Sequence, residues 1–121
     1  MFKQEDIAVR TNGGPVEVDI DCGFTQHLDF DCKLFDAQGN NAQFIIDGSN
    51  LHSDPPPFAI NVVPPQLVGR LLLIKATVQR LAGPDFAVDA TFRQDGTVIG
   101  AISVSGTIED HKTVSLVGRF V

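Results

Sequence analysis

The stretch His27–Leu51, HLDFDCKLFDAQGNNAQFIIDGSNL, decides the fold. Its first half places apolar side chains at every second position, namely Leu28, Phe30, Cys32 and Leu34. Asp29, Asp31 and Lys33 occupy the alternate positions, and they face the other way because side chains alternate along a strand. The chain then turns at residues 36–40 and returns through residues 44–46. This pattern predicts a β-hairpin with one face in a core and one face in water.

Further strand patterns follow one another at short intervals through the rest of the chain. They cover residues 1–11, 16–22, 70–80, 86–93, 98–108 and 114–120. Asp95-Gly96 is the favoured two-residue hairpin turn. We therefore predict an all-β fold without significant helix, a two-sheet antiparallel β-sandwich of seven or eight strands that forms one domain over residues 1–121. A small barrel stays open as the alternative.

For two of these strands the sequence also predicts a position in the sheet. Residues 70–80, RLLLIKATVQR, are apolar on both faces at their start, which is typical of a central strand, although a helix also fits part of the pattern. Residues 16–22 are followed by Gly23–Gln26, which we expect to form a hairpin with the His27 strand. That pairing would place Asp19 and Asp21 on the same outer face as Asp29 and Asp31. Gly100, Gly106 and Gly118 lie at apolar positions, which indicates bulges or close approach of the second sheet.

Residues 47–69 contain five of the seven prolines and cannot form a central strand. We expect a long crossover between two sheets, with its apolar residues packed on the body. A partner-binding loop is the alternative, and its candidate residues are Pro55, Pro56, Pro57 and Phe58. A polyproline ligand is disfavoured because this segment lacks a flanking arginine and the PxxP spacing.

Composition and charge narrow the classes of partner. The net charge is −6, and residues 1–69 carry a net −7, so phosphate backbones are repelled and we predict no nucleic-acid partner. No segment approaches the roughly 20 apolar residues of a membrane span. The chain has no Trp and no Tyr, which counts against a carbohydrate platform. We expect a cytoplasmic protein in which Cys22 and Cys32 are reduced.

Patterns of catalytic residues are missing from the sequence. There is no Gly-rich phosphate loop, and His27, His52 and His111 are scattered. The two cysteines lack histidines at zinc-ligand spacing. A small hydrolase with paired carboxylates stays an alternative, because acidic residues are frequent and such enzymes need only two of them. We nevertheless predict that the protein is not an enzyme.

The acidic residues around the first hairpin suggest one possible cofactor. Asp29, Asp31 and Asp36 are candidate calcium ligands, since Ca²⁺ takes oxygen ligands from several carboxylates. Side chains in the middle of a strand are poorly placed to surround one ion. A solvated acidic face without any cofactor is therefore the leading interpretation, and calcium is the alternative.

Residues 28–54 also resemble a known family. Leu28-Asp29-Phe30-Asp31, then Leu34-Phe35-Asp36, Gly39, Phe44 and Ser53-Asp54-Pro55, are similar to the TerD family of tellurite-resistance and stress proteins. The resemblance implies a β-sandwich that binds calcium. The chain departs from the family pattern after the returning strand, where Asp47–His52 and prolines replace a long acidic loop.

These observations lead to a ranked set of functions. The first is a non-catalytic β-sandwich module that binds a protein partner or itself through a sheet edge or through the loop of residues 54–65. The second is a calcium-binding, TerD-like stress protein. The third is the paired-carboxylate hydrolase.

Overall fold

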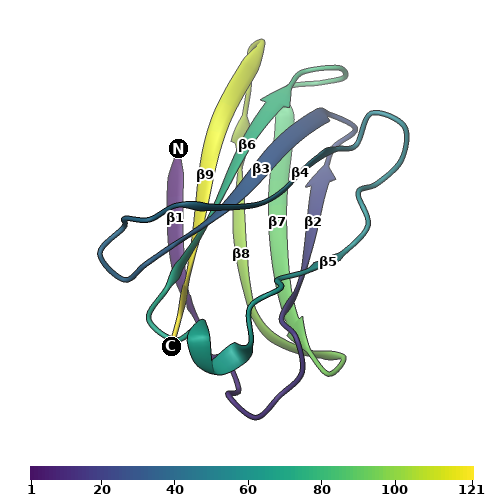
Figure 1. Ribbon diagram of the computed structural model, residues 1–121. Coiled ribbons are helices and arrows are strands. Elements are labelled where there is room, and N and C mark those ends of the chain that lie inside the picture. The colour runs from purple at the N-terminus through teal and green to yellow at the C-terminus, as the bar shows by residue number, and fades with distance from the viewer.

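A computed structural model describes all residues, 1–121, as two packed layers of β-strands (Figure 1). The elements in chain order are β1 (Phe2–Ile7), β2 (Glu17–Gly23), β3 (His27–Phe35), β4 (Gln43–Ser49), β5 (Phe58–Ala59), the 3₁₀ turn η1 (Pro64–Gln66), β6 (Leu71–Gln79), β7 (Asp85–Gln94), β8 (Thr97–Thr107) and β9 (His111–Phe120). One sheet has the order β1-β9-β6-β3-β4 and the other β5-β2-β7-β8. The predicted all-β sandwich is confirmed.

Two details differ from the prediction. The sandwich has nine strands because Phe58 and Ala59, inside the expected crossover, pair with the start of β2. The sheets are also not wholly antiparallel, since β1 runs parallel to β9 at the edge of its sheet (Figure 1). The end of the chain holds β1 there, because the N–H of Val121 donates to the carbonyl of Ile7 at 2.9 Å.

The core lies between the two sheets and consists of the alternate apolar residues predicted above. β3 buries Leu28, Phe30, Cys32 and Leu34, and β6 buries Leu72, Ile74, Ala76 and Val78. β6 is a strand at the centre of the five-stranded sheet, as its apolar pattern predicted. The β3–β4 hairpin is confirmed, with a bulge between Cys32 and Lys33.

The predicted hairpin between β2 and β3 is wrong. β2 pairs with β5 and β7, whereas β3 pairs with β4 and β6 in the other sheet. Phe24 and Thr25 both have positive φ, at 63° and 58°, and this turn leads the chain from one sheet to the other. Both strands have one apolar face, and the two faces are buried by packing on opposite sides of the core. Asp19 and Asp21 therefore lie on the opposite surface from Asp29 and Asp31.

A buried glutamine closes one end of the sandwich, where Gln26 is 2% exposed. Its Nε2 donates to the carbonyls of Ala82 and Gly83 at 3.0 Å and of Asp85 at 2.8 Å. Its Oε1 accepts from the N–H groups of Leu81 at 2.7 Å and Ala82 at 3.2 Å. One side chain thus pairs with four backbone groups of the β6–β7 loop and with the carbonyl of the first residue of β7.

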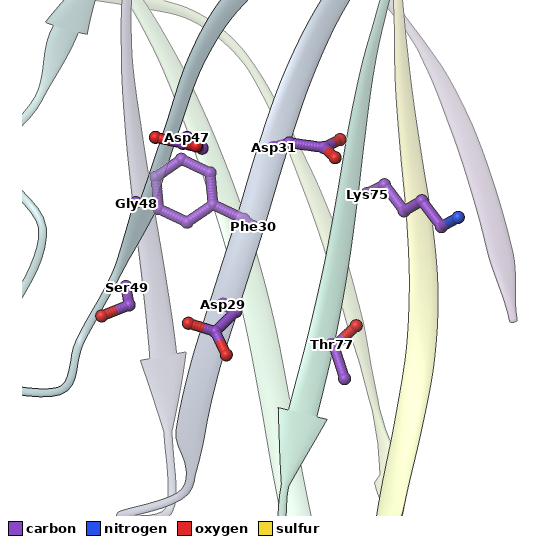
Figure 2. A pocket seen from close by; sticks show the side chains of 8 residues that line it. All are labelled: Asp29, Phe30, Asp31, Asp47, Gly48, Ser49, Lys75 and Thr77. Atoms are coloured by element: carbon purple, nitrogen blue, oxygen red, sulfur yellow. The ribbon is translucent and has the colours of Figure 1, made fainter.

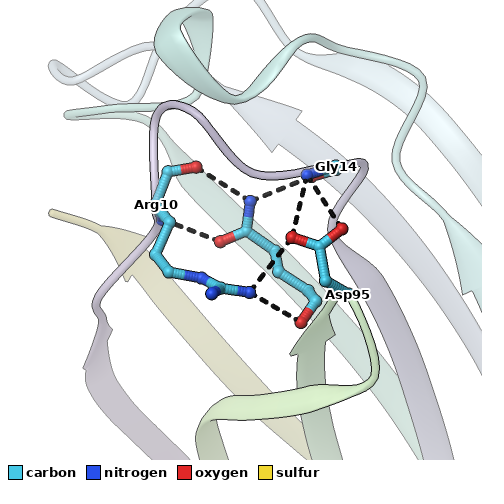
Figure 3. A network of polar contacts seen from close by, with 4 residues as sticks. Arg10, Gly14 and Asp95 are labelled. Carbon is cyan, nitrogen blue, oxygen red and sulfur yellow. Dashed lines mark hydrogen bonds and ion pairs between the residues drawn. The ribbon is translucent and has the colours of Figure 1, made fainter.

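A second buried glutamine, Gln94, closes the opposite end (Figure 3). Its Oε1 accepts from the N–H of Arg10 at 2.7 Å, and its Nε2 donates to the carbonyls of Arg10 and Gly14 at 2.9 Å. The Arg10 guanidinium donates to the carbonyl of Gln94 and to the Asp95 carboxylate, which also accepts from the N–H of Gly14. These bonds hold the β1–β2 segment against the β7–β8 turn.

The edge formed by β1 and β8 is tightly packed. Ile7 is fully buried between the sheets and lies against Gly100 of β8. A Cβ at Gly100 would lie 2.6 Å from Cδ1 of Ile7, so a side chain there needs a rearrangement of Ile7. The predicted close approach of the sheets at this glycine is confirmed.

Candidate functional site

The outer face of the five-stranded sheet carries a shallow recess of about 620 Å³ (Figure 2). Its lining consists mainly of polar side chains from β3, β4 and β6, namely Asp29, Asp31, Asp47, Ser49, Lys75 and Thr77. The strand register explains this grouping, because Asp31 lies between Asp47 of β4 and Lys75 of β6. Asp29 lies in the same way between Ser49 and Thr77. Lys75 is the one basic residue in the lining of this recess, whose other polar groups are carboxylates and hydroxyls.

The floor of this recess depends on Gly48. A Cβ at Gly48 would lie 2.8 Å from Cζ of Phe30, so only glycine lets the Phe30 ring lie over β4. The same ring stacks on Phe58 with centroids 6.5 Å apart. Phe30 and Phe58 thus close the sandwich between its β4 and β5 edges.

The structure does not bring Asp36 together with Asp29 and Asp31. Asp36 follows β3 and lies roughly 16 Å along the chain from Asp31, at about 3.3 Å per residue. Its carboxylate accepts hydrogen bonds from the N–H of Asn40 at 2.8 Å and the side chain of Asn41 at 2.8 Å. These bonds lower the pKa of Asp36, with the Asn40 bond the largest cause. Its oxygens therefore stabilise the β3–β4 turn.

Metal binding has no preformed cluster to support it. No group of three or more His, Cys, Asp or Glu side chains lies in an arrangement that could hold an ion. Calcium binding at Asp29, Asp31 and Asp36 stays a prediction.

A second acidic group lies on the outer face of the four-stranded sheet. The register places Asp21 of β2 directly opposite Asp89 of β7. Desolvation raises the pKa of Asp21, and the nearby charges of Asp19, Asp54 and Asp89 raise it further. Arg93 offsets part of this repulsion, and its guanidinium lies 3.6 Å from the Asp19 carboxylate. Sequence reasoning missed the Asp21–Asp89 pair because it assigned β2 to the wrong partner strand.

Replacing Asp21 with asparagine is expected to stabilise the protein at pH 7. Two like charges directly opposite one another destabilise a sheet. Removing the charge of Asp21 should raise the free energy of unfolding by at most about 0.5 kcal/mol, because this side chain is largely exposed and water screens its charge. The raised pKa means that the folded state holds its proton more tightly than the unfolded state. At this site the wild type therefore becomes more stable as the pH falls through the raised pKa of Asp21, because protonation removes the repulsion. The difference in free energy of unfolding between Asp21→Asn and the wild type should disappear near pH 3. Thermal melting across this pH range measures both.

Asp110→Asn is the control, because that carboxylate is 87% exposed and lies beside His111. A less stable Asp21→Asn variant at pH 7, or a gain that persists unchanged at low pH, would contradict the repulsion.

The four predicted partner-binding residues lie together on the rim between β4 and β5. Pro55 is buried and Phe58 half-buried, while Pro56 and Pro57 are exposed. They line a groove of about 170 Å³ with Phe30 and Ile46. The crossover packs on the body through the buried Ile60 and Leu67, whereas Val63 and Val68 are exposed, so the predicted packing is confirmed only in part. The role of the segment in partner binding stays a prediction.

The four edge strands differ in how they resist pairing with another chain. β1 carries Lys3, Glu5 and Asp6, and β4 carries Asp47 and pairs through a bulge. β5 has only two residues and follows three prolines. Charges, bulges, prolines and short length are the usual protections of an edge. β8 carries no charge and no proline over eleven residues, TVIGAISVSGT, and has one irregularity near its start. β1 of the facing sheet and the preceding Met1 pack against it at Gly100 and Gly106, but Ala101, Ser103 and Ser105 stay exposed.

The free hydrogen-bonding groups of β8 can be assigned to particular residues. The N–H of Ile108 donates to the carbonyl of Pro84, next to the pair Asp85–Thr107, so the even-numbered residues from Gly100 to Gly106, beyond the irregularity at the start of β8, bond to β7. The backbone groups of Ala101, Ser103 and Ser105 therefore point away from β7. No other strand pairs with this side of β8. Sequence analysis named a sheet edge in general, and the sheet order identifies which one is open.

The cysteines offer no reactive group at these sites. Both are free thiols, and Cys32 is buried. Burial raises the pKa of Cys32 to about 12, which keeps it a neutral thiol.

No helix has the length and apolar character needed to cross a membrane. A search of family models, curated proteins and solved structures finds no match for this chain.

Proposed function

We propose that the protein is a non-catalytic interaction module that accepts a β-strand of a protein partner along the free edge of β8. The observation that carries the proposal is the open, uncharged, proline-free edge of eleven residues. Such an edge presents a row of unpaired N–H and C=O groups that pair readily with an extended chain.

The side chains along β8 support this role. Ala101, Ser103 and Ser105 are exposed and small, so an added strand meets no bulky side chain over the middle of β8. The exposed Val98 lies near the start of the strand. Ile102 and Val104 are buried and anchor the strand to the core, so β8 is held in an extended shape before a partner arrives. Little conformational entropy is then lost on the β8 side when a partner strand is added.

A peptide titration tests the proposal. The probe is a synthetic peptide with the sequence of Thr97–Thr107 followed by two lysines for solubility, added to isotope-labelled protein. We expect the amide signals of Ala101, Ser103 and Ser105 to shift and to gain protection from hydrogen exchange. Ser103→Pro is the matched control, since it removes an outward N–H that β7 does not use and should abolish the effect. Absence of any shift at millimolar peptide would contradict strand addition.

A further inference from the structure

We propose, building on the function above, that the natural occupant of the β8 edge is the β8 strand of a second copy of this chain. The two strands run antiparallel about a two-fold axis near Ser103, so that two four-stranded sheets join into one sheet of eight strands. Such an interface uses the same surface on both copies.

The distribution of charge favours self-pairing at β8. A chain with a net charge of −6 is repelled by its own copy wherever acidic residues meet across a two-fold axis. β1 carries two acidic side chains and one basic side chain, so pairing through β1 would bring together two strands of net negative charge, and pairing through β4 would bring Asp47 of each copy to a shared edge. β8 contains no charged residue, and the acidic residue registered opposite Ser103, Asp89 of β7, stays about three strand spacings, roughly 14 Å, from its own copy, so the repulsion is weaker at this edge.

The two ends of the edge have opposite charge. Arg93 pairs with Val98 at the start of β8, and Asp85 pairs with Thr107 at its end. Antiparallel pairing brings the start of one β8 beside the end of the other, so Arg93 of each copy approaches Asp85 of its partner. These charges are about three strand spacings apart, roughly 14 Å, which exceeds the Debye length of about 8 Å at physiological salt, so they favour the antiparallel orientation only at low ionic strength. Parallel pairing would bring like charges together.

The charges on β1, which lies beside β8, are also compatible with a two-fold axis near Ser103. Ile7 lies against Gly100, and Met1 lies near Gly106, so the residues between them run beside the middle of β8. These residues include Lys3 and Glu5, which form an ion pair at 3.8 Å. Two-fold pairing near Ser103 brings Lys3 of one copy toward Glu5 of the other, which places opposite charges across the interface.

The size of the contact sets the expected affinity. A strand of eleven residues is about 36 Å long, and an interface one strand wide falls below the usual 1,600 Å² or so of a stable complex. We therefore expect a dimer with a dissociation constant in the micromolar range.

Sedimentation equilibrium from micromolar to submillimolar concentration tests the dimer in three proteins. The wild type and Ser103→Thr, which keeps the outward N–H, should dimerise with similar affinity. Ser103→Pro should stay monomeric at least tenfold above the wild-type dissociation constant, with its β-sheet circular dichroism retained. Hydrogen exchange of the wild type is the second measurement, because dimerisation should slow exchange at Ala101, Ser103 and Ser105 as concentration rises, even where Ser103→Pro fails to fold.

Two results would overturn this inference. One is a wild type that sediments as a monomer throughout, and the other is a dimer whose β8 amides gain no protection. A monomer that still binds the β8 peptide would remove the second copy as occupant and leave strand addition standing. A monomer that binds no peptide would remove both proposals.

Discussion

Replacing Gln26 with leucine is expected to lower the free energy of unfolding by about 3 kcal/mol. The substitution keeps the size of the side chain but removes five hydrogen bonds, four to the β6–β7 loop and one to Asp85 at the start of β7. The N–H groups of Leu81 and Ala82 lose their partner at a site where the glutamine is 2% exposed. Buried groups left unpaired cost about 1–3 kcal/mol each, and partial hydration of the loop recovers some of this. Urea unfolding followed by circular dichroism gives the difference.

Gln66→Leu is the control for this experiment, because Gln66 is exposed in the η1 turn and its side chain makes no hydrogen bond within the chain. We expect that control to change stability by less than about 0.5 kcal/mol. Gln26→Glu adds a second comparison, since its carboxylate retains acceptors for Leu81 and Ala82 but faces three carbonyl groups that need a donor. If Gln26→Leu lowers the free energy of unfolding by less than about 1 kcal/mol, the backbone N–H and carbonyl groups of the β6–β7 loop find other hydrogen-bond partners without this side chain.

Gln94→Leu is expected to cost a similar amount, about 2–3 kcal/mol, at the opposite end of the sandwich. It leaves the N–H and carbonyl of Arg10 and the carbonyl of Gly14 without their side-chain partner. The Arg10 bonds to the carbonyl of residue 94 and to Asp95 remain possible, so the segment is weakened and not released (Figure 3). Denaturant unfolding measures the total cost.

Hydrogen exchange locates the effect of Gln94→Leu. We expect faster exchange at the N–H groups of Arg10 and Gly14 and little change at Leu81 and Ala82, which belong to the Gln26 end. Gln26→Leu should show the reverse pattern. If both variants raise exchange equally at both ends, the two glutamines do not act on separate loops.

The secondary structure could be predicted because its signal is local. Apolar residues of β3 repeat with a period of two, and this pattern predicts that one face of the strand is buried; they are Leu28, Phe30, Cys32 and Leu34. Asp95 and Gly96 have positive φ, at 52° and 77°, as the Asp-Gly hairpin prediction requires. Such features depend only on neighbouring residues.

The candidate sites could be predicted only in part because they depend on strand partners. Asp29 and Asp31 were expected on one face and lie there, but Lys75 and Asp47 join them only through the register of β3 with its two neighbours. Asp36, grouped with them in the calcium prediction, accepts hydrogen bonds within its own turn. The β8 edge became visible only once the order of the strands in the sheet was known.

The sequence by itself determined the type of each main element, the face that each strand buries and the position of the turns. The tertiary structure decided which strands are neighbours, and with them the Asp21–Asp89 repulsion, the recess around Lys75, the two buried glutamines and the open edge of β8. The physical reason is that burial has a local signature, a period of two residues, whereas pairing does not. A turn such as Gly23–Gln26 is compatible with a hairpin or with a passage between sheets, and the packing of two apolar faces against each other selects the passage.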